Sequence, residues 1–256
     1  MELVIKKDLP ILSGKNAKAF SLWRDGRLRH LSGFIHKLDV NIELLRLENK
    51  TKVLDTGCGF GFEIMELTSR GCDCTGLDIH EGFIDIARTV SNYHNLEARF
   101  DVGDSHKLPY PDYSFDAVMS DEFFSHVKDI DATLSESIRV LKVGGRLFIR
   151  DGNILCPPTL FDLLVLYPIR TRSKNGGIKW LLNRNAIVKN LYGHDFAGKD
   201  EDIKSLYWWR KKIKRFENLK LILATTSHAY ETPRKFLKVL AEPFWGQIMI
   251  VAQRIK

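Results

Sequence analysis

The chain has 256 residues, of which 44% are hydrophobic, so it is long enough to bury one large core, and disorder is not the default interpretation. No apolar stretch approaches the roughly 20 residues that span a bilayer, and the opening residues MELVIKKDLPILSGK lack a secretory signal. We therefore expect a cytoplasmic protein, and the net charge of +7 permits an anionic partner without requiring one.

The cysteines point to no metal site. They include no CxxC pair and no paired cluster that would supply four zinc ligands. Reduced, buried thiols are the expected state, which fits a reducing compartment. The four are Cys58, Cys72, Cys74 and Cys156.

Residues 15–50 predict two helices. One is expected around NAKAFSLWRDG, and a longer one follows where apolar residues recur at helical spacing. The apolar positions of the longer helix are Leu31, Phe34, Ile35, Leu38, Ile42 and Leu45.

From residue 52 to residue 151 short β-branched runs alternate with helical patterns, as in β-α-β units around a parallel sheet. Helices are expected at about 60–70 and 81–93, and a third, which contains Leu134, Ile138 and Leu141, is expected to stop at the double glycine 144–145. The predicted strands of the whole chain are 52–56, 72–78, 96–102, 114–120, 145–151, 219–227 and 247–253.

A glycine-rich turn lies between the first strand and the first helix. The stretch VLDTGCGFG places Gly57, Gly59 and Gly61 at alternate positions. Glycine adopts positive φ and lets the backbone approach a ligand closely, and a strand-to-helix crevice is the usual ligand position in such sheets. A tight turn that merely needs room is the alternative. The phosphate-binding spacing GxGxxG would need glycine where Phe62 stands, which weakens a nicotinamide-dinucleotide interpretation.

The spacing of Asp55 and these glycines resembles the first motif of class I S-adenosylmethionine-dependent methyltransferases. In that family the turn passes close to the methionyl part of the cofactor. The resemblance therefore implies that S-adenosylmethionine is the cofactor and that Asp55, Gly57, Cys58 and Gly59 help to bind it.

Later motifs continue the resemblance. Asp78 ends the second strand, where the family's acidic residue accepts hydrogen bonds from the ribose hydroxyls, and Ile79 follows it. Without the resemblance, Asp78 could equally be a turn residue or an N-cap. The stretch GDSHKLPYPDYSFDAV is similar to the family's third-strand exit and implies that Asp104 accepts from the adenine amino group, with Ser105 beside it. RVLKVGGRLFIRD is similar to the family's double-glycine turn and fifth strand, with Val143 at a frequent proline position.

The resemblance implies an α/β fold, namely a Rossmann-like doubly wound seven-stranded sheet, mostly parallel with an antiparallel final strand and with helices on both faces. We expect residues 1–50 to form a helical lid and residues 51–151 the cofactor-binding core. Residues 152–218 are expected to be a cap insertion that covers the acceptor, and residues 219–256 a strand pair that completes the sheet.

Candidate catalytic residues follow the fourth strand in SDEFFSHVKD. By the resemblance, Ser120 lies beside the cofactor, and Glu122 or His126 could act as a general base. A structural hydrogen bond is the alternative for either residue. Amino-directed nucleic-acid methyltransferases carry Asn or Asp, two prolines and an aromatic residue here, which SDEFF does not match.

The segment from residue 152 to residue 218 leaves two alternatives open. The run WWRKKIKRF at 208–216 could contact RNA through its basic and aromatic residues. Its apolar members Trp208, Trp209, Ile213 and Phe216 could instead face the core at helical spacing. Cys156-Pro157-Pro158 is expected to be a loop, and the expected pocket walls are Phe161, Tyr167, Trp180, Tyr192, His194 and Trp208.

The sequence as a whole predicts methyl transfer from S-adenosylmethionine to a small organic acceptor at oxygen, nitrogen or carbon. One alternative is an RNA or protein methyltransferase that uses the basic run. Another is a non-catalytic, cofactor-binding partner subunit. A nucleic-acid partner is not favoured, and the sequence predicts no particular oligomeric state.

Overall fold

The computed structural model describes residues 3–153, 204–227 and 247–256. Its contacts divide the chain into two compact units, which are described separately. Unit 1 comprises Met1–Asp121, Asp131–Phe148 and Val251–Lys256, and unit 2 comprises Glu122–Ile130 and Ile149–Ile250. Most of the expected cap lies outside the described residues, as do Cys156-Pro157-Pro158 and the expected pocket walls Phe161, Tyr167, Trp180, Tyr192 and His194.

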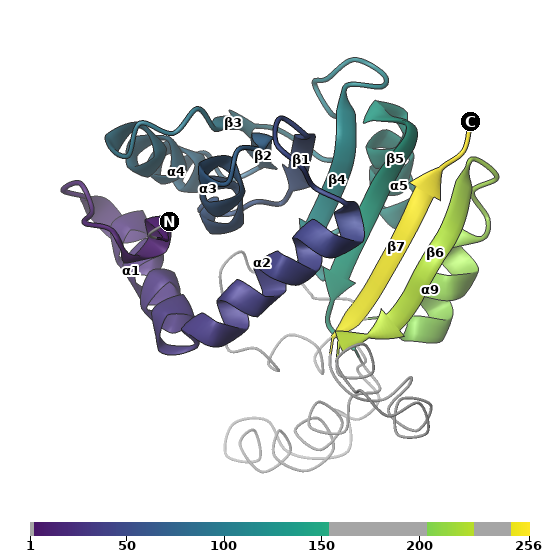
Figure 1. The fold of residues 1–256 in the computed structure, drawn as a ribbon, viewed down its shortest axis with the longest axis horizontal. Helices are drawn as coiled ribbons and strands as arrows, with labels where there is room; N and C mark the ends of the chain where they lie inside the picture. The colour runs from purple at the N-terminus through teal and green to yellow at the C-terminus, as the bar shows by residue number, and fades with distance from the viewer. Residues whose placement is uncertain (1–2, 154–203, 228–246) are drawn as a thin grey trace, which may run out of the picture. The chain divides into compact units, whose positions relative to one another are not determined.

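The strands form one seven-stranded sheet in the order β3-β2-β1-β4-β5-β7-β6. β1 pairs in parallel with β2 and β4, and β2 pairs in parallel with β3. The sheet is mostly parallel, with antiparallel final strands (Figure 1), which confirms the expected Rossmann-like architecture. The strands are β1 (Lys52–Thr56), β2 (Asp73–Asp78), β3 (Arg99–Val102), β4 (Phe115–Asp121), β5 (Leu141–Asp151), β6 (Leu219–Thr226) and β7 (Ile248–Arg254).

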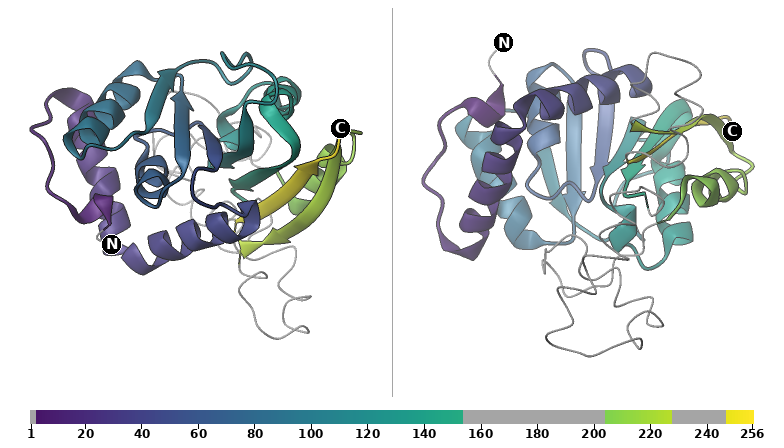
Figure 2. Two further views of the ribbon diagram at one scale, coloured as in Figure 1. Left: turned by 45° about the horizontal axis from the view of Figure 1, so that its top comes forward. Right: turned by 90° about the horizontal axis from the view of Figure 1, so that it is seen from below.

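Helices cover both faces of the sheet in unit 1. Figures 1 and 2 show α2 on one face and α5 on the other. The Arg146 guanidinium donates to the Leu44 carbonyl at 2.6 Å, which ties β5 to the last turn of α2. The helices are η1 (Val4–Lys6), α1 (Gly14–Arg29), α2 (Leu31–Leu45), α3 (Phe62–Ser69), α4 (Glu81–Tyr93), η2 (Phe124–His126), α5 (Ile130–Val140) and α9 (Leu206–Ile213). Among the described residues, no helix has both the length and the apolar character needed to cross a bilayer.

The central strands are apolar on both sides, as expected for parallel strands covered by helices. Val53 and Leu54 of β1 and Ala117 and Val118 of β4 have no exposed surface. Two buried strands therefore carry the segments that follow Thr56 and Asp121.

The helix expected to continue through Leu141 ends at Val140, and β5 begins at Leu141. Arg254 gives a physical reason, because its guanidinium donates at 2.6–3.0 Å to the carbonyls of Ile138, Arg139 and Leu141. These carbonyls come at the end of α5, where the helix itself supplies no donors. A long-range side chain therefore helps to end the helix before the double glycine.

The basic run folds largely as a core-facing helix within unit 2. Trp209 and Ile213 of α9 are buried, which agrees with the core-facing alternative. Lys212 is also buried, and its ammonium lies 5.1 Å from the ring centre of the half-buried Trp208. Tyr207 is exposed.

Candidate cofactor site and methyl-transfer residues

The glycine turn, residues 57–61, requires glycine for two reasons. Gly57, Gly59 and Gly61 have φ of 75°, 55° and 70°, a region that L side chains rarely adopt. A Cβ on Gly61 would lie 2.3 Å from the ring of Phe100, and one on Gly59 would lie 3.2 Å from the ring of Trp23. The backbone here is therefore tightly curved and tightly covered.

The glycine turn is fixed to the end of β2. The amides of Gly57 and Cys58 donate to the Leu77 carbonyl at 2.8 and 3.1 Å. The Gly59 amide donates to Asp78 Oδ2 at 2.9 Å. The turn and the Asp78 carboxylate are thus held as one unit at the carboxyl ends of two neighbouring strands.

An aromatic cluster packs against the glycine turn. Phe60 lies in the turn itself, and its ring contacts Phe20 and Trp23 of α1 and Phe83 of α4, with ring centres 4.4–5.5 Å apart. Such pairs stabilise packing beyond their area of burial. The first helix of the expected lid therefore rests on the turn, while a lid function stays a prediction.

Asp55 is a buried carboxylate with an unused acceptor. Within the described part of the chain, its Oδ1 atom has no hydrogen-bond partner. Burial raises the pKa of Asp55 well above its usual value, and the neighbouring carboxylates of Glu63, Asp121 and Asp78 raise it further. Such a group favours a cation or a hydrogen-bond donor beside it.

Asp78 and Asp104 share a local arrangement that the sequence analysis missed. Asp78 Oδ1 accepts the His80 amide at 2.9 Å and lies 3.0 Å from His80 Nδ1. Asp104 Oδ1 accepts the His106 amide at 2.9 Å and lies 2.6 Å from His106 Nδ1. The signal for both was a histidine two residues after each acid. Asp78 pairs with Val102 across β2 and β3, so the segments that follow the two strands begin side by side.

The other expected cofactor residues differ in exposure. Ile79 is 55% exposed, although it directly follows the buried Asp78. Cys58 is buried, and burial raises the pKa of its thiol well above the usual value, so the thiol stays protonated. The buried Ser105 hydroxyl lies 3.4 Å from Thr133 Oγ1 of α5.

Ser120 is fully buried at the end of β4. Its hydroxyl forms a hydrogen bond with the Thr56 hydroxyl, and it also donates to the Thr56 carbonyl at 3.4 Å. These contacts join the ends of β1 and β4. The assignment of Ser120 to the cofactor stays a prediction.

Part of this chain is similar in sequence to known proteins. A family described as a methyltransferase domain matches residues 54–149. Methyltransferase GfsG of Streptomyces halstedii is 39% identical over 115 residues, which are 44% of this chain and 41% of that protein. The 27-O-demethylrifamycin SV methyltransferase of Amycolatopsis mediterranei is 26% identical over 220 residues, covering 82% of this chain and 80% of that protein.

Solved structures show the same fold. A geranyl diphosphate C-methyltransferase from Streptomyces coelicolor A3(2), in complex with S-adenosyl-L-homocysteine, superposes with a TM-score of 0.59 at 17% identity and covers 86% of this chain and 78% of that one. Residues 54–149 are a class I S-adenosylmethionine-dependent methyltransferase domain. The chain spans less than half of the length of some curated relatives that it matches, 41% for GfsG.

The residues of this methyltransferase domain fit its cofactor, S-adenosylmethionine. The unused Asp55 oxygen suits a positively charged amino acid moiety. The three positive-φ glycines put no side chain on this stretch of backbone, although Phe100 and Trp23 already cover part of it. Asp78 offers carboxylate oxygens at the end of β2, the usual ligand edge of such a sheet.

The expected general bases, Glu122 and His126, belong to unit 2. Both are exposed. Glu122 has φ of 54°, its amide donates to the Arg150 carbonyl at 2.8 Å, and Gln247 Nε2 donates to its carboxylate. A positive φ in a non-glycine residue persists only when surrounding contacts hold it, and such residues concentrate at functional sites.

Asp151 is a residue of this segment that the sequence analysis missed. Its Oδ2 accepts the Ser125 amide at 2.8 Å, and its Oδ1 accepts the Gly152 amide at 2.7 Å. Burial raises the pKa of Asp151 to about 7, against the lowering effect of these amide donors. Asp151 therefore holds the segment that contains Glu122 and His126, and only its position at the end of the fifth strand could have indicated it.

Proposed function

We propose that this protein transfers the methyl group of S-adenosylmethionine to a small organic acceptor. The observation that carries the proposal is the buried Asp55 oxygen near the end of β1, which has no hydrogen-bond partner among the described residues. It comes two residues before a turn whose three glycines all have positive φ. The match to a methyltransferase family over residues 54–149 supports the same conclusion.

Each residue of the site has a proposed role. Asp55 accepts from the amino group of the methionyl moiety, and the glycine turn lets the backbone pass close to that moiety. Asp78 accepts from the ribose diol, because a carboxylate offers two acceptor oxygens and no donor. Ile79 contacts the cofactor next to Asp78, and Asp104 accepts from the adenine amino group with Ser105 beside it.

S-adenosylmethionine supplies an electrophilic methyl carbon on a sulfonium that leaves as a neutral thioether. The protein therefore needs mainly to align the acceptor with the methyl carbon and sulfur, and such orientation supplies up to roughly 7–11 kcal/mol in model reactions. Glu122 or His126 removes a proton from acceptors that carry one, which typically adds about 10²–10⁴-fold to the rate.

A hydroxyl group is the first acceptor class to test. The 27-O-demethylrifamycin SV methyltransferase aligns with 82% of this chain over 80% of its own length, and its name denotes methylation of an oxygen. A hydroxyl gains most from a base, because it must lose its proton during transfer. Glu122 and His126 are both exposed, and either could take this role.

RNA is the second candidate acceptor, because α9 exposes Tyr207 together with Lys211. Contacts between basic side chains and the phosphates of RNA weaken steeply as the salt concentration rises. Retention on RNA that disappears between about 50 and 200 mM salt, together with label transfer to RNA, would favour this candidate over the first.

The first experiment tests cofactor binding. Asp78→Asn should weaken binding of S-adenosylhomocysteine by roughly 10–150-fold, because the ribose hydroxyls lose a charged acceptor. Titration calorimetry measures the change. Asp85→Asn is the matched control, since Asp85 lies on α4 with 62% of its side chain exposed. Equal affinities for wild type and Asp78→Asn would remove Asp78 from the site.

The second experiment tests transfer. Wild-type protein is incubated with methyl-labelled S-adenosylmethionine and a fractionated metabolite extract, and the labelled products are identified by mass spectrometry. Label in a small molecule supports the proposal. Label only in RNA or protein supports the alternative acceptors, and binding without any transfer supports a non-catalytic subunit.

A further inference from the structure

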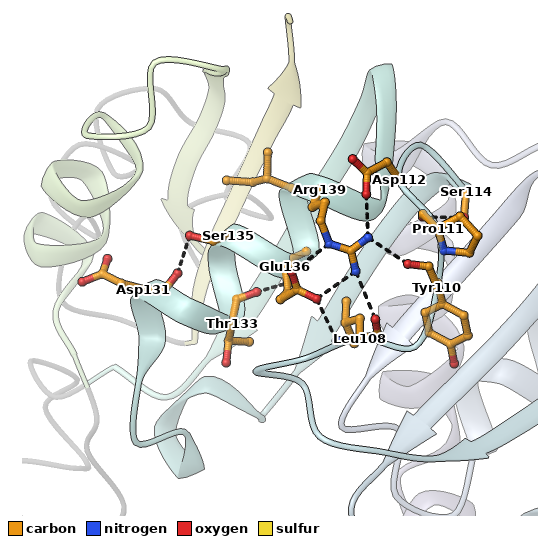
Figure 3. Close-up of polar contacts among 12 residues, drawn as sticks. Leu108, Tyr110, Pro111, Asp112, Ser114, Asp131, Thr133, Ser135, Glu136 and Arg139 are labelled. Atoms are coloured by element: carbon orange, nitrogen blue, oxygen red, sulfur yellow. Dashed lines mark hydrogen bonds and ion pairs between the residues drawn. The ribbon is translucent and has the colours of Figure 1, made fainter.

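One arginine holds the segment between β3 and β4, residues 103–114, which we call the β3–β4 loop. Arg139, in the last turn of α5, donates to the carbonyl oxygens of Leu108 and Tyr110 at 3.0 and 2.8 Å. It also donates to the Asp112 carboxylate at 2.7 Å and twice to Glu136 at 2.8 Å. Figure 3 shows these contacts converging on one guanidinium, and together they use all five of its N–H donors.

Glu136 completes the arrangement from one turn earlier in α5. Its Oε2 accepts the Leu108 amide at 2.8 Å, so both backbone polar groups of Leu108 are held by α5. The hydrogen bonds from Arg139 lower the pKa of Glu136 and keep it ionised. The pair grips the backbone of the loop, so the contact does not depend on which side chain stands at position 108.

The same stripe of α5 reaches the start of the loop. Thr133 lies three residues before Glu136, and its hydroxyl is 3.4 Å from the buried Ser105 hydroxyl. Residues three apart lie on one face of a helix. Three residues of α5 therefore contact the loop at successive points, namely Thr133, Glu136 and Arg139. Figure 3 shows the contacts of Glu136 and Arg139.

The geometry points to Arg139 as a positioning residue for recognition of the adenine base. The loop starts where β3 ends and contains Asp104, the acceptor that the proposed function assigns to the adenine amino group. Only a few residues separate Asp104 from Leu108, and within them the Lys107 amide donates to the Asp104 carbonyl at 3.0 Å. Fixing Leu108 from α5 therefore limits where the Asp104 carboxylate can lie.

This inference rests on the proposed function, and it makes a narrower claim about the nucleoside. Removing the hydrogen bonds from Arg139 and Glu136 should free the β3–β4 loop and weaken the contact to the adenine amino group. The glycine turn and Asp78 should continue to hold the methionyl and ribose parts. The measured signature is lost discrimination between adenine and hypoxanthine, because hypoxanthine lacks the amino group.

The test compares the dissociation constants of S-adenosylhomocysteine and S-inosylhomocysteine by titration calorimetry. Wild-type protein should prefer the adenine compound by about tenfold or more, the usual effect of losing one hydrogen bond to a charged group. Arg139→Gln should bind S-adenosylhomocysteine about tenfold more weakly and S-inosylhomocysteine almost unchanged. Arg139→Lys should not rescue discrimination, because an ammonium cannot reproduce the planar fork.

Matched variants separate positioning from folding. Glu136→Gln keeps the size of the side chain and should lose part of the discrimination between the adenine and inosine compounds. This variant tests the contacts from α5 to the loop if Arg139→Gln fails to fold. Arg99→Gln removes a surface arginine whose side chain is 62% exposed and should leave both constants unchanged. In a double-mutant cycle, Asp104→Asn and Arg139→Gln should be strongly non-additive, since both act on one contact.

Each outcome decides the matter. Affinities for both compounds that fall by the same factor in Arg139→Gln, or that do not fall at all, overturn the inference. Wild-type protein that binds S-adenosylhomocysteine without discriminating against the inosine compound also overturns it. Failure of wild-type protein to bind either compound instead overturns the proposed function.

Discussion

The glycine turn and the β3–β4 loop both leave the carboxyl ends of parallel strands in unit 1, yet they are held in different ways. Backbone conformation shapes the turn, because three glycines adopt positive φ and their amides bond to nearby backbone and to Asp78. Distant side chains shape the loop, because Arg139 and Glu136 of α5 hold its backbone. The turn therefore depends on its own glycines, whereas the loop depends on residues outside its own sequence.

The largest expected effect comes from Gly61→Ala, which tests whether the turn depends on backbone and space. The left-handed backbone costs roughly 1–2 kcal/mol for a non-glycine residue. The new Cβ would lie 2.3 Å from the Phe100 ring, and overpacking adds roughly 1–3 kcal/mol or more. Unfolding by denaturant, followed by tryptophan fluorescence, should show a loss of roughly 2–5 kcal/mol.

Gly14→Ala is the control for that substitution. Gly14 also has positive φ, at 83°, but a Cβ there would meet no atom within 4 Å. It should therefore show only the backbone cost of roughly 1–2 kcal/mol. Equal losses in the two variants would mean that the ring of Phe100 does not restrict the turn.

A second prediction concerns the charge beside the turn. Burial raises the pKa of Asp55, and the neighbouring carboxylates raise it further. In the free protein the Asp55 carboxyl group therefore keeps its proton at pH values above the usual aspartate range. A bound cation favours the carboxylate and lowers this pKa. Binding of S-adenosylmethionine should therefore release a proton, and affinity should rise by up to about tenfold per pH unit in the window between the two pKa values.

The same shift affects stability with a definite sign. Because the pKa of Asp55 is raised in the folded state, its contribution to stability is full below the ordinary aspartate range and is lost as the pH rises through the folded-state pKa.

Titration calorimetry of cofactor binding, carried out in two buffers with different ionisation enthalpies, counts the protons that binding releases. Asp55→Asn should release none, and an unchanged proton count in this variant would assign the release to another group.

The sequence predicted the parts of the fold that local patterns encode. Alternating strand and helix patterns predicted the sheet, and the spacing of Gly57, Gly59 and Gly61 predicted a positive-φ turn, because glycine is the residue that such a backbone requires. These features depend on residues close together in the chain.

The missed features depend on contacts between distant residues. Arg254 lies more than 100 positions after α5 in the chain, yet its guanidinium helps to end that helix. The spacing of apolar residues within α5 does not indicate where the helix stops. Arg139 and Asp151 stand in ordinary helix and strand positions, and their roles appear only when the fold brings the loops to them. The acids proposed to bind the cofactor could be expected from a resemblance, but the contacts that orient them could not.

The smallest expected effect separates two similar acids. His80 and His106 each contact the carboxylate two residues earlier, through amide and Nδ1, so the local geometry is the same. The surroundings differ, because the Asp78 side chain is 11% exposed and that of Asp104 is 55% exposed. Water can replace a lost donor at Asp104 far more readily than at Asp78.

His80→Ala should therefore weaken binding of S-adenosylhomocysteine by roughly 3–10-fold, and His106→Ala by less than about threefold. The amide contacts remain in both variants, so calorimetry measures the ring contribution alone. If His106→Ala had the larger effect, exposure would not govern how firmly the two acids are held, and the β3–β4 loop would depend on its own histidine as well as on Arg139. Equal effects would likewise show that the shared local geometry, rather than the surroundings, sets the strength of each contact.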